Sequence, residues 1–474
     1  MRPIVAAPFL ALAAQVGVAA EVPARPNIVF ILADDLGYGE LGCYGQKLVA
    51  TPNLDRLASD GMRFTQFYAG DTVCAPSRSV LMTGQHMGHT RVRGNSGGLP
   101  QSLTPDDITI ARVLKEGGYA TGLIGKWGLG LPAEPGAPDK QGFDYYFGFP
   151  SQTDAHNYYP EFLWRDGQKV PLPNVVTHLG SGELTGYATK AVAYASDLFA
   201  EDARGFLDHN RGKPFFLYLA LTAPHANDER ARALGDGNEV PDYGPYADKP
   251  WTAAQKGHAA MITRMDRDIG GVLAHLKQLG LDERTLVIFT SDNGPHREGG
   301  GDYDPEFFDA NGPFRGEKRD LFEGGIRVPF IARWPGHIKP GTALGQVGYF
   351  GDMMPTFAEL AGAKLPDRKL DGVSLVPTLL GRGAQAQHEF LYWEFYERGL
   401  TQAVLLGDGR WKGIRLEAPA GPIELFDLQS DMAEKTDVAE KHPEIVARIA
   451  GFMRAAHVDN EYWRFDRPVP ASRK

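Results

Sequence analysis

The sequence contains very little cysteine. Only Cys43 and Cys74 occur among 474 residues, which excludes a small fold held together by several disulfides. Two cysteines in an exported chain can still form one disulfide, and this alternative stays open. We favour two separate thiols, because Cys43 lies in a loop rich in glycine and tyrosine and Cys74 lies in a motif suited to other chemistry.

The sequence also lacks an excess of positive charge. Its formal net charge is −10, with 49 Lys and Arg against 59 Asp and Glu, which is unlike a nucleic-acid-binding protein. After residue 20, no apolar run is long enough to span a bilayer. We therefore expect no nucleic-acid partner and no stable membrane anchor. An acidic protein that handles an anionic substrate must gather its cations locally.

The N-terminus has the pattern of a signal peptide. Met1-Arg2 precedes an apolar run that ends in Val18-Ala19-Ala20, a small-x-small cleavage site. A membrane anchor is the alternative, but the run is short and is interrupted by Gln15 and Gly17. We expect a periplasmic or secreted protein.

Four continuous apolar runs are typical of strands buried on both faces of a parallel sheet. They span residues 27–33, 119–124, 214–221 and 285–290. Segments with helical spacing separate them, most clearly residues 253–279. This alternation predicts an α/β fold with a doubly wound, mostly parallel central sheet flanked by helices.

The last part of the chain has a different pattern. Short strand-like runs alternate with turns between residues 390 and 426, and a helix is expected at about 443–455. This predicts a smaller C-terminal antiparallel sheet plus one helix. We therefore divide the chain into a signal peptide at residues 1–20, a main domain at 21–382 and a C-terminal α+β subdomain at 383–474.

Polar residues stand where the four apolar runs end: Asp34-Asp35, Lys126, His225 and Asp292-Asn293. Taken singly, each has a structural alternative, such as a helix cap, a solvated strand end or a packed histidine. Taken together they favour one shared site, because ligands of doubly wound sheets bind beyond the carboxyl ends of the strands. Adjacent buried carboxylates repel each other, and oxygen ligands favour calcium or magnesium over zinc.

Residues 74–84 combine a possible nucleophile, a cation and a helix start. Pro76 suits a first helical turn and Gly84 a helix end. A helix that runs away from Cys74 would place the thiol near its positive N-terminal end, where anions bind. The alternative is that Cys74 is an ordinary small buried residue.

Six motifs follow one another along most of the chain: Ala-Asp-Asp-Leu-Gly from Ala33, Cys-Ala-Pro-Ser-Arg from Cys74, Gly-Lys-Trp-Gly-Leu-Gly from Gly125, Ala-Pro-His from Ala223, Ser-Asp-Asn-Gly from Ser291, and Lys318 ahead of Glu-Gly-Gly-Ile-Arg-Val-Pro. Together they resemble the formylglycine-dependent sulfatases of the alkaline phosphatase superfamily. By this resemblance the chain is a sulfuric ester hydrolase. A formylglycine-generating or sulfatase-maturing enzyme would be its partner and would convert Cys74 to formylglycine, whose hydrate is the nucleophile.

The resemblance also implies roles for single residues. Asp34, Asp35, Asp292 and Asn293, with an oxygen of the modified Cys74, would hold one calcium ion. Arg78 would orient the formylglycine, Lys126 and Lys318 would contact sulfate oxygens, and His225 would protonate the departing alcohol oxygen.

One position departs from the family pattern. Many members read Gly-Lys-Trp-His in the third motif, and that histidine is the expected base, whereas this chain has Gly128. Our hypothesis is that His296, or another group in residues 296–304, takes its place. Normal turnover by His296→Ala would exclude His296.

Two segments are candidates for substrate binding. Residues 131–190 lack clear periodicity and are expected to form a long, loop-dominated excursion. His156 and Tyr158 lie within it, and His296 and Glu298 lie in the other segment. By resemblance they suit a sulfated sugar of the galactose or N-acetylgalactosamine type, or an aryl sulfate. The alternative, that the rings only pack the excursion onto the body, has equal weight.

Two other functions remain open. A phosphonate or phosphate ester hydrolase of the same superfamily would use the same site, and a noncatalytic carbohydrate-binding scaffold would keep only the fold. Rates of hydrolysis of sulfate and of phosphate esters distinguish a sulfatase from a phosphate ester hydrolase. Oxidation of Cys74 distinguishes an enzyme from a noncatalytic scaffold. A thiolate enzyme is disfavoured, because Cys74 and Arg78 are too close in sequence for a Cys-x5-Arg phosphate loop.

Overall fold

The structure is a computed structural model that describes residues 25–95, 102–180, 182–460 and 462–465. The predicted signal peptide, residues 1–20, therefore lies outside the described residues. Among the helices of the described ranges, none is both long and apolar enough to cross a bilayer.

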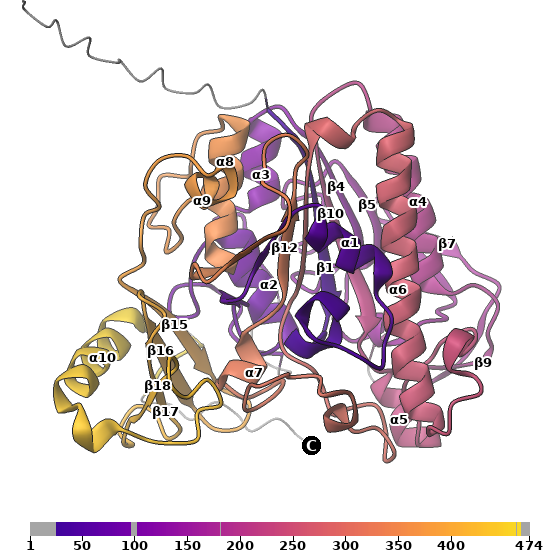
Figure 1. The fold of residues 1–474 in the computed structure, drawn as a ribbon. Coiled ribbons are helices and arrows are strands. Elements are labelled where there is room, and N and C mark those ends of the chain that lie inside the picture. Colours follow the sequence, from indigo (N-terminus) through magenta and orange to yellow (C-terminus); the bar gives the residue numbers. More distant parts are fainter. Residues whose placement is uncertain (1–24, 96–101, 181, 461, 466–474) are drawn as a thin grey trace, which may run out of the picture.

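A ten-stranded sheet forms the centre of the molecule, and helices cover both of its faces (Figure 1). Its five central strands are parallel. They are, in spatial order, β11 (Thr285–Ser291), β1 (Asn27–Asp34), β10 (Phe215–Pro224), β4 (Ala120–Lys126) and β5 (Tyr145–Phe149). The predicted fold class is confirmed.

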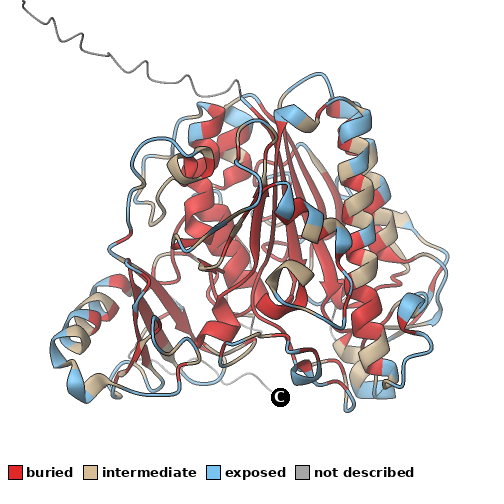
Figure 2. Cartoon of the chain, in the orientation of Figure 1, coloured by how far each residue is buried: buried red, intermediate tan, exposed pale blue. Residues whose placement is uncertain are grey.

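The central strands are hydrophobic on both sides because both faces are covered. All eight residues of β1 are buried, and they alternate between two hydrophobic clusters, with Phe30 on one face and Ile31 on the other. One face packs on α2 (Cys74–Thr83), α3 (Ile110–Glu116) and α8 (Met353–Ala361), and the other packs on α1 (Pro52–Ser59), α4 (Ala195–Asn210) and α6 (Ala253–Gln278). Figure 2 shows the resulting buried layer of strands between helices with exposed outer surfaces.

The outer part of the sheet is mixed. β12 (Phe330–Arg333) runs antiparallel to β11, and β2 (Met62–Phe64) and β13 (Thr342–Leu344) follow on that side. On the opposite side, β6 (Phe162–Arg165) and β7 (Gln168–Pro171) extend the sheet beyond β5. Two small sheets pair β3 (Phe67–Tyr68) with β14 (Gly348–Tyr349) and β8 (Val175–His178) with β9 (Gly186–Lys190).

The C-terminal part forms its own antiparallel sheet, as predicted. It consists of β15 (Phe390–Phe395), β16 (Thr401–Leu406), β17 (Trp411–Arg415) and β18 (Glu424–Asp427), with α10 (Pro443–Ala456) packed against it. In Figure 1 this unit lies beside the lower end of α2 and the short helix α7 (Glu323–Ile326). The domain boundaries at residues 20 and 382 stay predictions.

Residues 131–190 are an excursion with long irregular stretches, but five short strands, β5 to β9, lie in this range and were not predicted. The clearest missed signal is Asp166-Gly167, which joins β6 to β7 with φ values of 47° and 78°. Asp-Gly with positive φ at both residues is a strong hairpin signal.

The structure defines the starts of four helices of the main body. α5 (Asp228–Leu234) and α9 (Val376–Leu380) are short. α3 begins at Ile110, with the Thr109 side chain as its cap. Cys74 is itself the first residue of α2 rather than a residue before it.

A buried ion cluster joins the C-terminal sheet to the main body. The ammonium group of Lys412 on β17 lies 2.9 Å from Glu323 of α7 and 2.9 Å from Glu434. All three side chains are fully buried. Removing one member of a buried ion pair leaves an uncompensated charge, which is strongly destabilising.

We predict that Lys412→Met lowers the free energy of unfolding by about 3 kcal/mol or more. Burial and the Glu323 carboxylate already raise the pKa of Glu434 to about 7, against the opposing effects of Lys412 and of the backbone N–H of Glu323. Urea denaturation at neutral pH measures the change. Lys435→Met, at an exposed neighbouring position, is the control and should cost little. Equal stability of both variants would contradict this account.

Candidate active site

The carboxyl ends of the parallel strands bring the predicted site residues together. Asp34 is the last residue of β1, and Lys126 is the last residue of β4. His225 follows β10 directly, and Asp292 follows β11 directly. All four side chains are buried. The structure therefore brings the residues at these strand ends to one edge of the sheet, where the sequence predicted a shared site.

A glycine permits the close approach of two of these strands. Gly125 precedes Lys126 and has a φ of 109°. A Cβ at this position would lie 1.9 Å from the backbone carbonyl oxygen of Ala220 in β10. Glycine is therefore required where β4 delivers Lys126 to the site.

Three cations compensate the three carboxylates. Arg78 donates from Nε and Nη2 to Asp292, at 3.0 and 2.7 Å. Lys126 donates to Asp34 at 2.6 Å, and Lys318, from the loop before α7, donates to Asp35 at 2.8 Å. Burial alone would lower the pKa of each lysine, but Asp34 and Asp35 respectively raise it.

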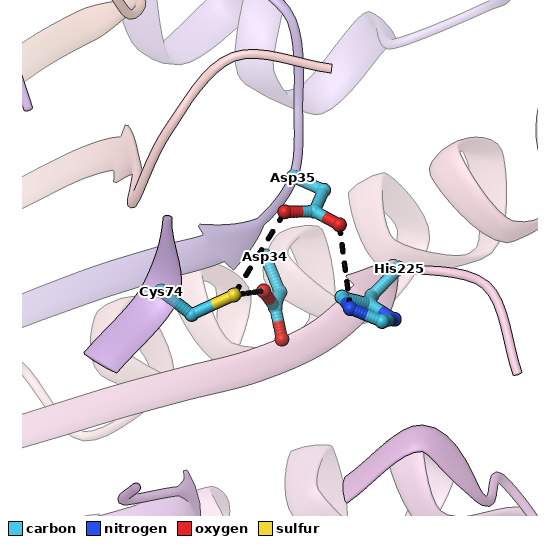
Figure 3. A group of neighbouring side chains, drawn as sticks. All are labelled: Asp34, Asp35, Cys74 and His225. Carbon is cyan, nitrogen blue, oxygen red and sulfur yellow. Dashed lines mark hydrogen bonds and ion pairs between the residues drawn. The ribbon is translucent and has the colours of Figure 1, made fainter. Parts of the chain in front are cut away.

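Cys74 faces the carboxylate pair from the start of α2. Its Sγ lies 3.2 Å from Oδ1 of Asp34 and 3.9 Å from Oδ1 of Asp35. Figure 3 shows the thiol directed at both carboxylates, with His225 on the other side of Asp35. Burial and Asp34 raise the pKa of the Cys74 thiol well above its ordinary value. The geometry is unsuited to a thiolate nucleophile.

The acidic residues fit a hard divalent cation. The Oδ1 of Asn293 is buried and has no hydrogen-bond partner among the described residues, while Nδ2 donates to Asp35 at 2.7 Å. Burial and Asp34 raise the pKa of Asp292 to about 7, despite its contact with Arg78. An unpaired amide oxygen beside three crowded carboxylates is a set of donors that calcium accepts. Asp34, Asp35, Cys74 and His225 also form a compact group of potential ligand atoms.

His225 contacts the site through one nitrogen only. Its Nδ1 lies 2.6 Å from the backbone carbonyl oxygen of Ala226, which only accepts, so Nδ1 carries the proton. Its Nε2 lies 3.2 Å from the Lys318 ammonium group, which only donates. The same Nε2 lies 3.4 Å from Oδ2 of Asp35, so an ammonium group and a carboxylate both face this nitrogen. Burial and Lys318 lower the pKa of His225.

Two of the predicted substrate-binding residues lie beside this centre. Glu298 accepts from Lys318 at 2.7 Å and also pairs with Arg319. Burial alone would raise the pKa of Glu298, but Lys318 and Arg319 hold it well below its ordinary value. The imidazole of His156 stacks on that of His225, with 4.7 Å between centroids.

Tyr158 and His296 have other partners than those expected. The Tyr158 hydroxyl lies 2.8 Å from the carbonyl oxygen of Thr222 and 2.6 Å from that of His225, so it supports the backbone at His225. His296 is fully buried, with Nε2 donating to Pro224 and Nδ1 accepting the N–H of Glu298. With both nitrogens bound to backbone groups, His296 is a poor candidate for the missing base.

The backbone at Gly128 explains why no side chain stands there. Gly128 has a φ of 78°, and a Cβ at this position would lie 2.5 Å from Oε1 of Gln152. Any other residue would be strained and would displace Gln152. The two cysteines are separate thiols, as favoured from the sequence.

One potentially functional residue was missed in the sequence. Glu229, on α5, lies 3.2 Å from Nδ1 of His156. Asn227 followed by two acidic residues is a recognisable helix start, and the Asn227 side chain accepts from the N–H of Arg230.

Comparison with known proteins identifies the relatives of this arrangement. The family model described as Sulfatase matches residues 26–363, and the model described as N-sulphoglucosamine sulphohydrolase, C-terminal, matches residues 314–456. The chain is 36% identical over 428 residues to arylsulfatase A of Homo sapiens, covering 85% of this chain and 76% of the relative. It is 30% identical over 505 residues to the N-acetylgalactosamine-6-O-sulfatase of Bacteroides thetaiotaomicron, covering 91% and 93%.

A solved structure shares the same fold. The crystal structure of Ps i-CgsB in complex with k-i-k-neocarrahexaose has a TM-score of 0.73 to this chain at 28% sequence identity. The match covers 91% of this chain and 92% of the other.

We predict that Ca²⁺ raises the Tm of protein first treated with a chelator. Free Ca²⁺ at one hundred times its Kd adds about 2.7 kcal/mol of stability to a protein that binds it only when folded. Asp35→Asn should abolish most of this shift, because it removes charge from the centre of the oxygen cluster. Thermal denaturation with and without Ca²⁺ measures the effect.

Asp371→Asn is the matched control, because Asp371 is a buried carboxylate that pairs with His86 and His89 instead. It should keep the response to Ca²⁺ even if its starting Tm is lower. A full response in Asp35→Asn would contradict the assignment of the cation site.

Proposed function

Because the chain belongs to the sulfatase family, we propose that it releases sulfate from a sulfated saccharide by means of a formylglycine at position 74 and one calcium ion. The chain is an enzyme that hydrolyses sulfate esters. One observation carries the finer proposal: the Cys74 side chain points from the start of α2 into a buried cluster of carboxylates and cations.

The surroundings of Cys74 support its conversion to formylglycine. The thiol is held neutral by burial and by Asp34, which raise its pKa, so it is unsuited to attack sulfur itself. Once formed, the hydrated aldehyde supplies an oxygen nucleophile in the same place. Arg78, which is fully buried and bound to Asp292, would keep a fixed positive charge beside it.

The cation site would be formed by Asp34, Asp35, Asp292 and Asn293. The unpaired Oδ1 of Asn293 supports this assignment. Calcium would add positive charge next to the nucleophile and to the sulfate oxygens. Without calcium, the positive charges of Arg78, Lys126 and Lys318 equal the negative charges of the three carboxylates. A bound divalent cation would therefore give the site a net positive charge, which suits an anionic ester.

The two lysines would hold the sulfate group. Both ammonium groups lie at the buried end of the site, Lys126 on Asp34 and Lys318 on Asp35. An ammonium group carries three N–H bonds. Those of Lys318 are directed at Asp35, Glu298 and His225, so a sulfate oxygen would replace one of these partners. Both lysines would stabilise the sulfate oxygens where charge accumulates. His225, by accepting from Lys318, would fix the direction of that lysine.

A saccharide is the substrate class we favour. Relatives include an N-acetylgalactosamine-6-O-sulfatase and a protein solved with neocarrahexaose. A cavity of about 400 Å³ opens beside Lys318 and is lined by further charged side chains. Its charged members are Arg297, Glu298, Glu317, Lys318, Arg319, Glu397 and Arg398. Carboxylates and guanidinium groups of this kind suit the hydroxyl and anionic groups of a sulfated galactose or N-acetylgalactosamine.

We also propose that the chain is exported to the periplasm or secreted. This rests on the pattern of residues 1–20. A formylglycine-generating or sulfatase-maturing enzyme of the host would act on Cys74 as the chain is made.

We predict that the tryptic peptide of residues 64–78, from protein made in its native host, shows the mass loss of thiol-to-aldehyde conversion. Cys74→Ala should release no detectable sulfate from sulfated galactose or N-acetylgalactosamine. Mass spectrometry and sulfate release measure the two effects.

Cys43→Ala is the matched control, since Cys43 lies in η2 (Gly42–Tyr44) and its backbone N–H donates to Asp55, whereas the Cys74 thiol faces Asp34 and Asp35. It should keep full turnover. An intact thiol at position 74 in an active protein would refute the formylglycine proposal, and faster release of phosphate than of sulfate would favour a phosphate ester hydrolase.

A further inference from the structure

A second cavity lies beside the one at Lys318. The Lys318 cavity has a volume of about 400 Å³, and the second cavity has a volume of about 320 Å³. Arg297 and Glu298 line both, so the two cavities meet at these side chains. The other lining residues of the second cavity are Asp228, Ala231, Arg232 and Gly300. We call it the α5 cavity, because three of these residues lie on that helix.

One face of α5 forms a wall of this cavity. Asp228, Ala231 and Arg232 are three and four residues apart, the spacing that places side chains on the same face of a helix. The short Ala231 side chain leaves space between the two longer ones. On the loop side, Gly300 has a φ of 111°, and a Cβ there would lie 2.2 Å from the backbone carbonyl oxygen of Gly235. Only glycine lets the loop approach the end of α5 this closely.

The first residue of α5 reaches the active site. One side-chain atom each of Asp228, His225 and Glu298 lie within 4.8 Å of one another. Oδ1 of Asp228 is buried and has no hydrogen-bond partner in the part of the chain that the structure describes. A buried oxygen without a donor is costly, and the hydroxyl groups of a saccharide are donors. Figure 1 shows α5 and α7 at the same, lower end of the central sheet.

Arg232 is less committed to other groups than the second arginine of the α5 cavity. Arg297 is held by three carboxylates, those of Asp304, Glu306 and Glu317. Arg232 lies 3.3 Å from a carboxylate oxygen of Glu229 and 3.8 Å from one of Asp228, and its side chain is 72% exposed. Exposed ion pairs contribute little to stability, so an anionic ligand can replace these partners of Arg232.

We propose that the α5 cavity binds the sugar next to the sulfated one, and that Arg232 recognises a negatively charged group on this neighbouring sugar. The proposal rests on the proposed sulfate ester hydrolysis. The substrate is then a saccharide of at least two units, with the ester at Lys318 and the neighbouring unit against α5. The charged group is a sulfate ester or a carboxylate, both of which offer oxygens for paired hydrogen bonds with a guanidinium group. Arg232 contacts no reacting atom and determines specificity.

The first test compares three disaccharides that share one sulfated N-acetylgalactosamine. The neighbouring sugar is neutral in the first, carries a carboxylate in the second and carries a sulfate ester in the third. The wild type should have a lower KM for a charged disaccharide than for the neutral one. A lower KM for only one charged compound supports the proposal and identifies the group that is recognised. Equal KM values for all three would overturn the proposal.

The second test removes the charge of Arg232. Arg232→Gln should reduce the preference for the charged over the neutral disaccharide, measured as the ratio of their kcat/KM values, by about fivefold. The change should lie in KM rather than in kcat, because Arg232 is remote from the reacting atoms. An unchanged ratio, or a loss of kcat that is equal on both disaccharides, would overturn the proposal.

A third test fills the cavity without changing its charge. Ala231→Leu adds bulk to the wall, and leucine has nearly the helix propensity of alanine. This variant should raise KM on the disaccharides relative to KM on the sulfated monosaccharide, which leaves the α5 cavity empty. Equal effects on the monosaccharide and the disaccharides, or no effect on either, would overturn the proposal.

The opposite direction along the site is tested in the same way. The Lys318 cavity is also lined by Arg398, which lies 3.6 Å from Asp320 and is 54% exposed. Arg398→Gln should affect the three disaccharides alike and leave their order of preference unchanged. If Arg398→Gln abolished the preference and Arg232→Gln kept it, the saccharide would extend away from α5, and the proposal would be overturned.

Arg56→Gln is the matched control, because Arg56 is an exposed arginine that pairs with Asp60 of the same i,i+4 spacing at 3.4 Å. It should leave all KM values unchanged, and the Ca²⁺-induced rise in Tm checks that each variant is folded. If formylglycine-bearing wild-type protein released sulfate from none of the compounds, the proposed function itself would fail. Release by the wild type without a preference for a charged neighbour would reject only the role of the α5 cavity.

Discussion

Three carboxylates buried at one edge of the sheet set the conditions for the rest of the structure. Asp34, Asp35 and Asp292 lie at the ends of adjacent strands, where solvent cannot screen their repulsion. Cations must therefore reach them from elsewhere in the chain. α2 brings Arg78, β4 brings Lys126, and the loop before α7 brings Lys318. The same crowding that requires these cations creates a place for a divalent ion.

The nucleophile position depends on the same constraint. The first turn of α2 carries Cys74 against Asp34 and Asp35, so the residue to be modified is held beside the cation site. The ring of His225 lies beside Lys318 and stacks on that of His156, and its Nε2 faces both Lys318 and Asp35. The nucleophile position, the candidate cation site and the lysines therefore share one edge of the sheet.

Much of this was predictable from the sequence, for physical reasons that differ between elements. Central strands are buried on both faces, so their apolar runs are continuous, and the residues that end them must share one sheet edge. Short antiparallel strands such as β6 and β7 leave a weaker pattern, although the Asp166-Gly167 turn was a usable signal. Contacts such as that between Glu229 and His156 depend on tertiary packing and leave no trace in spacing. For the same reason, Tyr158 was expected to bind substrate rather than backbone.

The most direct test of the account is a crystal structure of the protein from its native host, grown with Ca²⁺. The account predicts one ion bound by oxygens of Asp34, Asp35, Asp292 and Asn293 at about 2.3–2.6 Å, with an aldehyde or its hydrate at position 74 among the ligands. A structure with an intact thiol, no ion, and Lys126 and Lys318 as the sole partners of the carboxylates would contradict it.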